Sequence, residues 1–495
     1  MRHLNDTSAE ATTSRRPSRR TLLKAIGGTA ALAAAPVLAA GPAGAAEGGP
    51  YDVIVIGAGF AGITATRELR ARGKRVLLLE ARGRVGGRTY VDTFGGHQVE
   101  MGGTWVETTQ PHIAAELTRY DIALTEEHPV DRVLLPTPSG PKEFTPEDAF
   151  NRTGAVLEKL FDGSRQYFER PFEPLYRSDL LQSLDRLSLR DRLDQLGLTA
   201  EEELLVNGQT AIYSGGSSKQ GALTMLSHWW SLAGWSNQGW ADTQRWRMTN
   251  GTSGLLDAML AEAKPVLRLN SPVASVTDTG SLVYVTLKSG VRYSATRAVV
   301  AVPVNVWPTI KFSPSLPAAH TTAGAQGIAV PNAYKMFIHA KAGAGKFSAQ
   351  GAEGGSPIPM LMPFKETSQG LLYVAFSTDP TLDPADKAQV ASAVRRLGAE
   401  LDIIEVRAHD WGRDPYARGG WAFRKPGQLT SLYPSIHNTS GRVAFASGDV
   451  ANGWSGFLDG AAESPRPFTS QSPSQRGGPV HDGLQLQHRL RPEQP

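Results

Sequence analysis

A glycine pattern near the start of the chain could bind a phosphorylated nucleotide. Gly57, Gly59 and Gly62 form G-x-G-x-x-G, directly after the β-branched run DVIVI at residues 52–56. Such a run is typical of a buried parallel strand. The first glycine permits a tight turn, the second lets the backbone approach a pyrophosphate, and the third lets the following helix pack closely on the strand. The pattern therefore predicts a dinucleotide site with a helix N-terminus facing the phosphates.

An acidic residue ends the next predicted strand. The stretch RVLLLE closes at Glu80, at the distance of about twenty residues where a carboxylate can accept hydrogen bonds from a ribose. The glycine pattern alone is a weak indicator, because a glycine-rich turn that binds no ligand can have the same sequence pattern. Strand, helix, second strand and acid occur here in register, which favours a bound dinucleotide, and the acid disfavours a 2′-phosphate.

One lysine lies in a run that should be buried. Lys335 belongs to NAYKMFIHA, where strand alternation places Tyr334 and Met336 on the opposite face from it. A buried ammonium is costly unless it has partners, so one interpretation is an edge-strand lysine that extends its amine to solvent. The other is a functional amine inside a pocket, and the residues alone leave both open.

Aromatic residues stand close to the end of the chain. Trp411 precedes a D-P turn, Trp421 stands in GGWAF, and Phe457 stands in NGWSGFLDGA. Each of them alone is more often a core residue than the wall of a ligand site. The run SHWWSLAGWSNQGW, at 227–240, poses the same choice between core packing and a wall of a substrate entrance.

Composition limits the class of protein. With 495 residues and 40% hydrophobic content, the chain can bury a large core and exceeds one ordinary domain. It contains no cysteine, which excludes disulfides, thiolate metal sites and any covalent link that needs a thiol. We predict no metal site.

The first 46 residues differ from the rest. SRRTLLK, at 18–24, resembles a twin-arginine export signal, and a short, weakly apolar stretch with small residues suited to cleavage after Ala45 or Ala46 follows it. We therefore expect a signal peptide over 1–46, export to a periplasmic or secreted location, and no stable membrane anchor. A basic tail without a targeting role is the alternative.

The distribution of charge argues against nucleic acid. Residues 1–46 hold six Lys or Arg and two Asp or Glu, a net charge of +4 that equals the formal charge of the whole chain. The basic excess is thus confined to a segment that should be removed. We expect no nucleic-acid partner.

The sequence after the first acid resembles one family. EARGRVGGRT, at 80–89, resembles the signature of the flavin-containing amine oxidases, in which the arginine of G-G-R contacts the pyrophosphate. Further motifs of that family are similar to VEMGGTWVETTQPH (99–112), RMTNGTSGLLDAML (247–260), SPVASV (271–276) and RAVVAVPVNVW (297–307). The resemblance therefore covers most of the chain after the leader and implies FAD, not NAD.

The resemblance also implies which residues bind FAD. Asp449 stands where the family has an acid near the ribityl phosphate, a role compatible with capping the final helix. Relatives with covalent FAD carry a cysteine at the position of Gly420, so FAD should be noncovalent here. One departure is Asn250, where the family usually has glycine. The implied residues are Gly57, Gly59, Phe60, Ala61, Gly62, Glu80, Ala81, Arg82, Gly87, Arg88, Gly102, Gly103, Thr104, Trp105, Val273, Trp411, Asp449 and Trp454.

The implied catalytic residues are Lys335, Trp421 and Phe457. By resemblance, Lys335 is the family's lysine, linked through a water to flavin N5, and the two aromatic residues form the substrate cage. The flavin takes a hydride from the carbon next to an amine, and an apolar pocket favours the neutral amine that this requires. The implied partners are a small-molecule amine and oxygen or another electron acceptor, while a homodimer is left open.

The predicted fold class is α/β. A discontinuous Rossmann-like FAD-binding domain is expected at about 50–120, 245–305 and 408–464, because the cofactor motifs fall in these three segments. An interleaved α+β substrate-binding domain is expected from a mostly helical segment, 121–244, and a strand-rich segment, 306–407.

The sequence around GGTWVETTQPH and GGWAFRKPGQL most resembles the bacterial nicotine oxidoreductase and pseudooxynicotine oxidase branch of the family. This resemblance favours a secondary or cyclic amine as substrate. An L-amino-acid oxidase is one alternative. Such relatives usually carry an arginine after the G-G loop for the substrate carboxylate, whereas this chain reads WVETTQ there. A non-catalytic or unstable flavoprotein is the other alternative, because the end of the chain is unusual.

The last predicted helix should stop early. Pro465 and Pro467 follow directly after GFLDGAAES, and proline ends a helix because it lacks the amide proton and clashes with the preceding turn. Residues 465–495 are polar and rich in Pro, Gln and Ser, a composition that predicts disorder. We interpret this tail as the product of a reading-frame shift near codon 465, with genuine truncation as the alternative.

Overall fold

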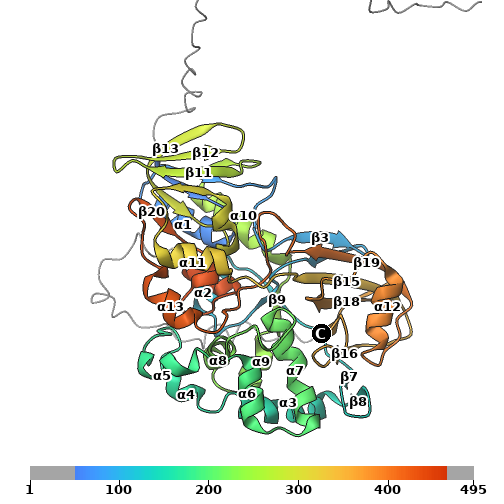
Figure 1. Ribbon diagram of the computed structural model, residues 1–495. Helices are drawn as coiled ribbons and strands as arrows, with labels where there is room; N and C mark the ends of the chain where they lie inside the picture. Colours follow the sequence, from blue (N-terminus) through green and yellow to red (C-terminus); the bar gives the residue numbers. More distant parts are fainter. Residues whose placement is uncertain (1–50, 465–495) are drawn as a thin grey trace, which may run out of the picture. The chain divides into compact units, whose positions relative to one another are not determined.

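The computed structural model describes residues 51–464, and the predicted signal peptide and the predicted tail lie outside the described residues. Two large sheets organise the described part (Figure 1). Within residues 51–464, no helix combines the length and apolar character needed to cross a bilayer.

The first sheet is built around β1 (Tyr51–Ile56), which pairs in parallel with β2 (Val76–Leu79) and β13 (Arg292–Val300). β1 and β2 are almost wholly buried, as expected for parallel strands covered on both faces. The strand order is β10-β2-β1-β13-β12-β11-β14, and β20 also pairs with β13. The other strands are β10 (Val266–Arg268), β11 (Val273–Asp278), β12 (Val283–Leu287), β14 (Lys311–Ser313) and β20 (Val443–Phe445).

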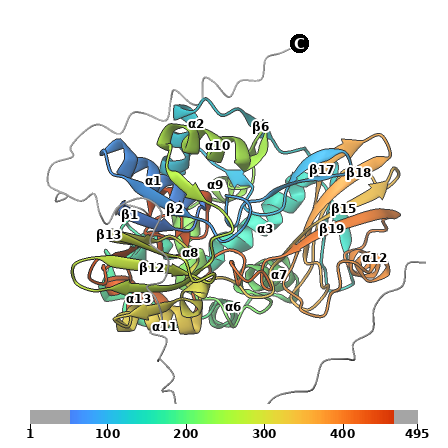
Figure 2. The same ribbon diagram turned by 90° about the horizontal axis from the view of Figure 1, so that it is seen from above.

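Helices from both ends of the chain pack beside this sheet. α1 (Phe60–Ala71) follows β1 through the glycine turn and packs against α10 (Gly251–Ala263) (Figure 2). α14 (Leu458–Glu463) contacts α1 and α2 (Pro111–Arg119), so the last described helix lies against the first. α14 begins at Leu458, with Phe457 as its N-cap residue.

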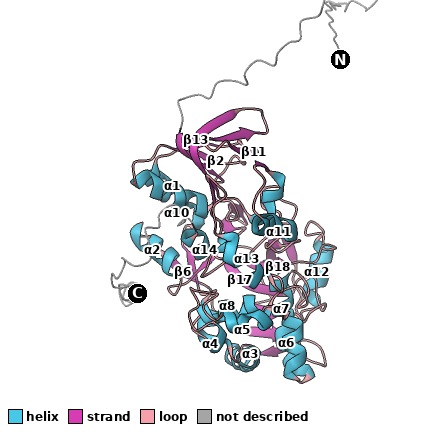
Figure 3. Ribbon diagram, turned by 60° about the vertical axis from the view of Figure 1, so that its left-hand side comes forward, coloured by secondary structure: helices cyan, strands magenta, loops and turns pink. Residues whose placement is uncertain are grey.

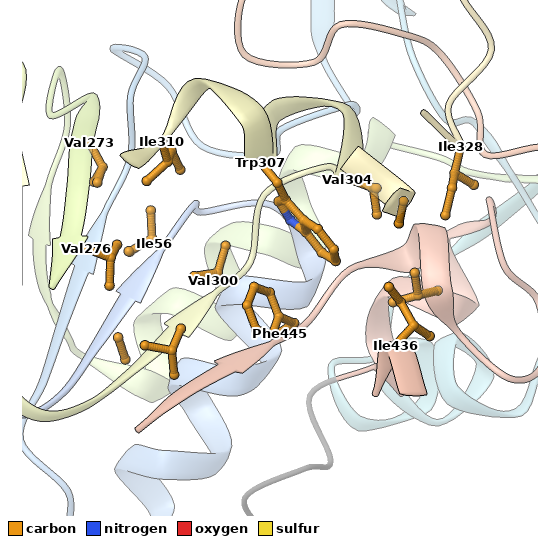
Figure 4. Packing of buried hydrophobic residues seen from close by; sticks show 14 of the residues in the cluster. Ile56, Val273, Val276, Val300, Val304, Trp307, Ile310, Ile328, Ile436 and Phe445 are labelled. Carbon is orange, nitrogen blue, oxygen red and sulfur yellow. The ribbon is translucent and has the colours of Figure 1, made fainter. Parts of the chain in front are cut away.

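A buried tryptophan anchors the layer on the other side of β13. Trp307, on the 3-10 helix η1 (Val304–Thr309), is 2% exposed, and its ring centroid lies 4.9 Å from that of Phe445. Figure 4 shows the indole beside Phe445 and Val304. η1 packs against α11 (Ala318–Gln326), which in turn packs against α13 (Gln428–Ile436).

The second sheet has the order β19-β15-β18-β17-β16-β7-β8, and β16 runs parallel to β7. Figure 3 labels β17 and β18 of this sheet among the strands drawn in magenta. β15 (Tyr334–Lys341) lies between β18 (Gly370–Ser377) and β19 (Ile403–Asp410), antiparallel to both. The remaining strands are β7 (Arg132–Leu135), β8 (Lys142–Phe144), β16 (Phe347–Gln350) and β17 (Met360–Thr367).

The predicted segments do not coincide with these elements everywhere, and β14 from the segment 306–407 belongs to the first sheet. β7 and β8 come from the segment expected to be mostly helical, 121–244. β19 crosses the expected border between 407 and 408. A sheet built from strands far apart in the sequence leaves no local signal of its membership, because pairing depends on tertiary contact.

The segment 146–242 folds into helices, and the starts of several of them are encoded locally. Ser188 and Asp191 form a capping box at α6, and Thr199 and Glu202 form another at α7, so each pair satisfies backbone donors that the first helical turn leaves free. The helices are α3 (Pro146–Leu160), α4 (Ser164–Tyr167), α5 (Ser178–Leu184), α6 (Leu189–Leu196), α7 (Ala200–Ser214), α8 (Leu223–Leu232) and α9 (Asn237–Asp242).

Short elements connect the two large sheets. Two small sheets carry the loop that follows the glycine motif, and α12 covers part of the second sheet. Their bounds are β3 (Val91–Phe94), β4 (His97–Glu100), β5 (Trp105–Val106), β6 (Leu124–Glu126), β9 (Trp246–Met248), α12 (Lys387–Arg395) and η2 (Gly448–Val450).

Candidate active site

A cavity of about 480 Å³ runs between residues of the first sheet and residues of the second. This volume falls in the range usual for sites of small molecules and cofactors. One end is lined by the glycine turn and by Glu80, and the other by aromatic side chains that include Trp421 and Phe457. A cofactor and a substrate can therefore meet inside it.

The glycine turn at the first end packs closely against the neighbouring backbone. Gly57 has a φ of +101°, and a Cβ atom there would come within 2.7 Å of the Ala301 carbonyl oxygen. Gly59 is the N-cap residue of α1. Because glycine has no side chain that could accept a hydrogen bond, the first amides of the helix stay available to an anion. Gly62 does not line the cavity; it packs against the Gly57 carbonyl, where a Cβ would come within 1.9 Å.

Glu80 is held firmly beside the turn. Its residue is 3% exposed, and its two carboxylate oxygens accept hydrogen bonds from the Ala58 and Arg82 N–H groups, both at 2.9 Å. The Arg82 guanidinium in turn pairs with Asp414, whose carboxylate also contacts His409 at 3.3 Å. Val273 lines the same end of the cavity.

Arg88 links the cavity to a buried acid. Its guanidinium donates to the Gly420 carbonyl at 2.8 Å and to the Asp449 carboxylate. Asp449 is fully buried, also accepts from the Val304 N–H at 2.9 Å, and does not line the cavity. Asp449 therefore contacts the cavity lining through Arg88, and its carboxylate caps the first amide of η1. It does not cap the final helix, as one interpretation of the sequence suggested, because Phe457 is the N-cap residue there.

Lys335 is buried on β15, an interior strand of the second sheet. It lies opposite Phe376 on β18 and His409 on β19, and the residue is 3% exposed. The edge-strand interpretation is therefore excluded. The Nζ atom donates to the Gly102 carbonyl at 2.9 Å and to the Thr104 hydroxyl. Burial lowers the pKa of Lys335 from its usual 10.5 to about 8, and two nearby carboxylates oppose this fall.

Aromatic rings surround the Lys335 amine. Its Nζ lies 5.2 Å from the ring centre of Trp105 and 5.7 Å from that of Phe376. Aromatic faces attract a cation at such distances, so the rings partly compensate for the lost hydration. Trp411, which lines the cavity nearby, donates from its indole to the Met101 carbonyl at 2.9 Å.

The two predicted cage residues come from different loops. The Trp421 indole donates to the Tyr213 carbonyl at 3.0 Å, which ties it to the end of α7. The Phe457 ring packs edge-on against Trp229 at 5.0 Å and against Trp454 at 4.9 Å. Trp454 is fully buried behind Phe457 and does not line the cavity.

The structure thus brings together most of the residues singled out from the sequence. All of them line this one cavity except Gly62, Asp449 and Trp454, which stand directly behind residues that do. The tryptophan-rich run at 227–240 contains residues of both kinds. Trp229 and Trp230 are core residues, whereas Trp240 lines the cavity.

Several lining residues carried no recognisable signal in the sequence. Tyr213 and Gln244 lie at the aromatic end, and the Gln244 amide approaches the Tyr213 hydroxyl at 3.4 Å. Burial raises the pKa of Tyr213, so its hydroxyl stays neutral. Met360 and Phe376, from β17 and β18, complete that end. Only tertiary structure places these four positions together.

The departure at Asn250 has a structural explanation. Asn250 has a φ of −101°, which any residue can adopt, and the next residue, Gly251, takes the left-handed position with a φ of +71°. A Cβ on Gly251 would come within 2.7 Å of the Val91 side chain. The glycine that this turn requires is therefore present one position later.

The first end of the cavity fits a dinucleotide. The open amides of α1, the glycine cradle and the buried carboxylate of Glu80 supply the partners that pyrophosphate and ribose need. The cavity then continues past Lys335 to the aromatic end, which leaves space for a flavin ring between the two.

Comparison with known proteins agrees with this geometry. Residues 60–466 match the family described as flavin containing amine oxidoreductase. Pseudooxynicotine dehydrogenase of a Pseudomonas species is 33% identical, over 84% of this chain and 85% of that protein. Nicotine dehydrogenase of Pseudomonas putida is 32% identical, over 84% and 86% respectively. (S)-6-hydroxynicotine oxidase of Paenarthrobacter nicotinovorans is 31% identical, over 83% and 97%.

Solved structures share the fold. Putrescine oxidase with putrescine bound superposes with a TM-score of 0.73 at 22% identity, over 85% of this chain and 98% of that one. Cyclohexylamine oxidase from Brevibacterium oxydans gives a TM-score of 0.70 at 18% identity, over 84% and 97%. At such identities, the likeness concerns the fold alone.

The chain belongs to the flavin-containing amine oxidase family. It is an FAD-dependent enzyme that oxidises amines, and the fold class, the cofactor and the enzyme class predicted from its motifs are confirmed.

Proposed function

We propose that the enzyme oxidises a secondary or cyclic amine that has one strongly basic, aliphatic nitrogen and an apolar or aromatic body. The distribution of charge in the cavity carries this proposal. Among the described residues that line it, Glu80 is the sole carboxylate, and both of its oxygens are engaged at the dinucleotide end. A second ammonium group on a substrate would therefore find no counter-ion at the aromatic end.

The relatives support the same substrate class. The three curated relatives are named for nicotine, hydroxynicotine and pseudooxynicotine. The substrate of the structural neighbour putrescine oxidase is instead a diamine. The lining described above suits the first group better than the second, because a pocket walled by Trp421, Phe457 and Tyr213 rewards apolar surface.

The residues of the chain favour the neutral form of the amine. Lys335 remains cationic below a pH of about 8 and stands inside the cavity, so it repels an alkylammonium ion. The aromatic walls penalise the charged form further by excluding water. A neutral amine keeps the nitrogen lone pair that must assist the departure of a hydride.

The hydrogen bonds of two lining side chains support a defined place for the reaction. The Gly102 carbonyl and the Thr104 hydroxyl hold the Lys335 amine, and the Tyr213 carbonyl holds Trp421. When bound, FAD supplies the acceptor for the hydride that leaves the carbon next to nitrogen, and oxygen or another acceptor takes the electrons onward. The resulting imine is hydrolysed after release.

The experiment that tests this proposal is an anaerobic titration of the FAD-loaded enzyme with a panel of amines. We expect nicotine or another cyclic amine to bleach the flavin absorbance, and putrescine to leave it unchanged. Bleaching by L-amino acids, with peroxide formed in air, would instead show an L-amino-acid oxidase. Bound FAD that no amine reduces would show a non-catalytic flavoprotein.

A further inference from the structure

A glutamate behind the cavity wall makes contacts that the proposed function has not used. Glu127 directly follows β6, and one of its carboxylate oxygens accepts a hydrogen bond from the Trp105 indole at 2.8 Å. Trp105 lines the cavity, and its ring lies 5.2 Å from the Lys335 amine. Glu127, Trp105 and Lys335 therefore form a chain of contacts from outside the cavity to its centre.

Glu127 is not an ordinary surface acid. Its side chain is only 21% exposed, although the carboxylate of its neighbour Glu126 is 53% exposed. Burial raises the pKa of Glu127, while Arg247 and the Trp105 indole oppose this rise. The ion pair with Arg247 is long, at 3.4 Å. Such a carboxylate contributes little to stability, because its desolvation offsets much of what its partners provide.

The charged groups around the Lys335 amine are few. Glu100 and Glu127 are the carboxylates that favour its ammonium form. His409 stands opposite Lys335 on β19, but its ring faces Trp411 and Asp414. Both hydrogen bonds that the amine donates go to uncharged oxygens.

Glu100 is committed elsewhere. Its carboxylate accepts from the Tyr90 N–H at 2.6 Å and from both the N–H and the hydroxyl of Thr252, at 3.2 and 2.6 Å. Thr252 lies in the first turn of α10, so Glu100 joins β4 to that helix. Any change of Glu100 would disturb the fold, whereas the Glu127 carboxylate bonds to the Trp105 indole and to Arg247, which stands opposite Trp105 on β9.

We propose that Glu127 is a positioning residue for Lys335, which holds the Trp105 ring against the amine and, through its negative charge, keeps that amine protonated at neutral pH. The hydrogen bond fixes the edge of the indole, so the face of the ring stays turned to the cation. The carboxylate also acts on the amine through space, and a charge in a partly buried site is screened less than it would be in bulk water.

The inference rests on the proposed function only for its kinetic consequence, since the protonation of Lys335 can be measured without turnover. Lysine labelled with ¹³C at Cε gives one NMR signal for each residue, and the Lys335→Met variant identifies the signal of Lys335. A pH titration of FAD-free and FAD-loaded protein then gives its pKa directly.

Glu127→Gln keeps the acceptor for the Trp105 indole but removes the charge. We expect this variant to lower the pKa of Lys335 by about one pH unit, the order expected for one charge several ångström away in a partly buried site. Glu126→Gln is the matched control, because it removes an adjacent charge that pairs with Arg245 at the surface, and it should leave the pKa unchanged. An unchanged pKa in Glu127→Gln, or an equal fall in Glu126→Gln, would overturn the proposal.

A double-mutant cycle separates positioning from general damage. In the FAD-loaded enzyme, Glu127→Gln should move the pH profile of flavin reduction or reoxidation to lower pH by the same amount as it moves the pKa. In the Lys335→Met background, it should have no further effect. An equally large effect in that background would mean that Glu127 acts only on the fold. Loss of amine oxidation in every variant and in wild type, with the pKa shift intact, would refute the proposed function but not this inference.

Discussion

The Lys335 amine donates a hydrogen bond of 2.9 Å to the backbone carbonyl of Gly102 and thereby joins the second sheet to the loop that leads into β5. That loop lines the cavity through Gly102, Gly103 and Thr104. A backbone oxygen has no rotamers, so the amine is held where the loop places it. The position of the Lys335 amine inside the cavity is therefore set by the main chain of this loop, although the lysine side chain is long and flexible.

We predict that FAD is bound without a covalent link. The chain has no cysteine, and a glycine, Gly420, stands beside Arg88 where a thiol would be needed. Precipitation of the holoenzyme with acid should release all of the flavin to the supernatant, where its absorbance measures it. A pellet that stays yellow would contradict the prediction.

Trp421→Ala should lower kcat/KM for an amine by about tenfold or more, equivalent to ~1.4 kcal/mol or more of lost transition-state binding. The indole forms part of the cavity wall and is held by the Tyr213 carbonyl. Trp421→Phe keeps an aromatic face and should lose less. An unaltered kcat/KM in the alanine variant, measured by steady-state kinetics, would remove Trp421 from the substrate cage.

Gln244→Glu should turn the preference toward diamines. It places a carboxylate at the aromatic end of the cavity, beside Tyr213, where the described lining has none. We expect the ratio of kcat/KM for putrescine to that for a cyclic amine to rise by about tenfold, the gain of a modest ion pair. Gln244→Leu, which adds no charge, should leave the ratio low; an equal rise in that variant would show that the carboxylate is irrelevant.

Local spacing explains what could be predicted from the sequence. The glycine turn and Glu80 follow one another within a single strand–helix–strand unit, so their geometry is determined by residues close in sequence. Lys335, Trp421 and Phe457 could be found only through resemblance to a family. Glu127 gave no signal at all, because its role arises from contacts with Trp105 and, beyond it, with a lysine on the second sheet.

Twin-arginine export is a proposal that follows from residues 18–24, which lie outside the described residues. We expect a route for folded proteins, because FAD must be loaded before the protein crosses the membrane. Arg19→Lys combined with Arg20→Lys removes the arginine pair of the signal and should therefore trap the precursor in the cytoplasm. Fractionation of cells followed by immunoblotting measures this. Normal export of the double variant would show that the segment is not such a signal.

Lys335→Met should change how stability depends on pH, since burial lowers the pKa of Lys335 to about 8 in the folded protein while the value stays near 10.5 in the unfolded chain. Between these two values the unfolded chain binds more protons, so wild-type stability rises as pH rises from 8 to 10.5. Below pH 8 the cost of burying the Lys335 ammonium is complete, at most ~3 kcal/mol.

The Lys335→Met variant has no titrating amine at this position. Its thermal midpoint relative to wild type should therefore be highest near pH 7 and fall toward pH 10. Lys341→Met, at the exposed end of the same strand, is the control and should show no such trend. A midpoint difference between Lys335→Met and wild type that is the same at pH 7 and pH 10 would mean that the Lys335 amine is not desolvated.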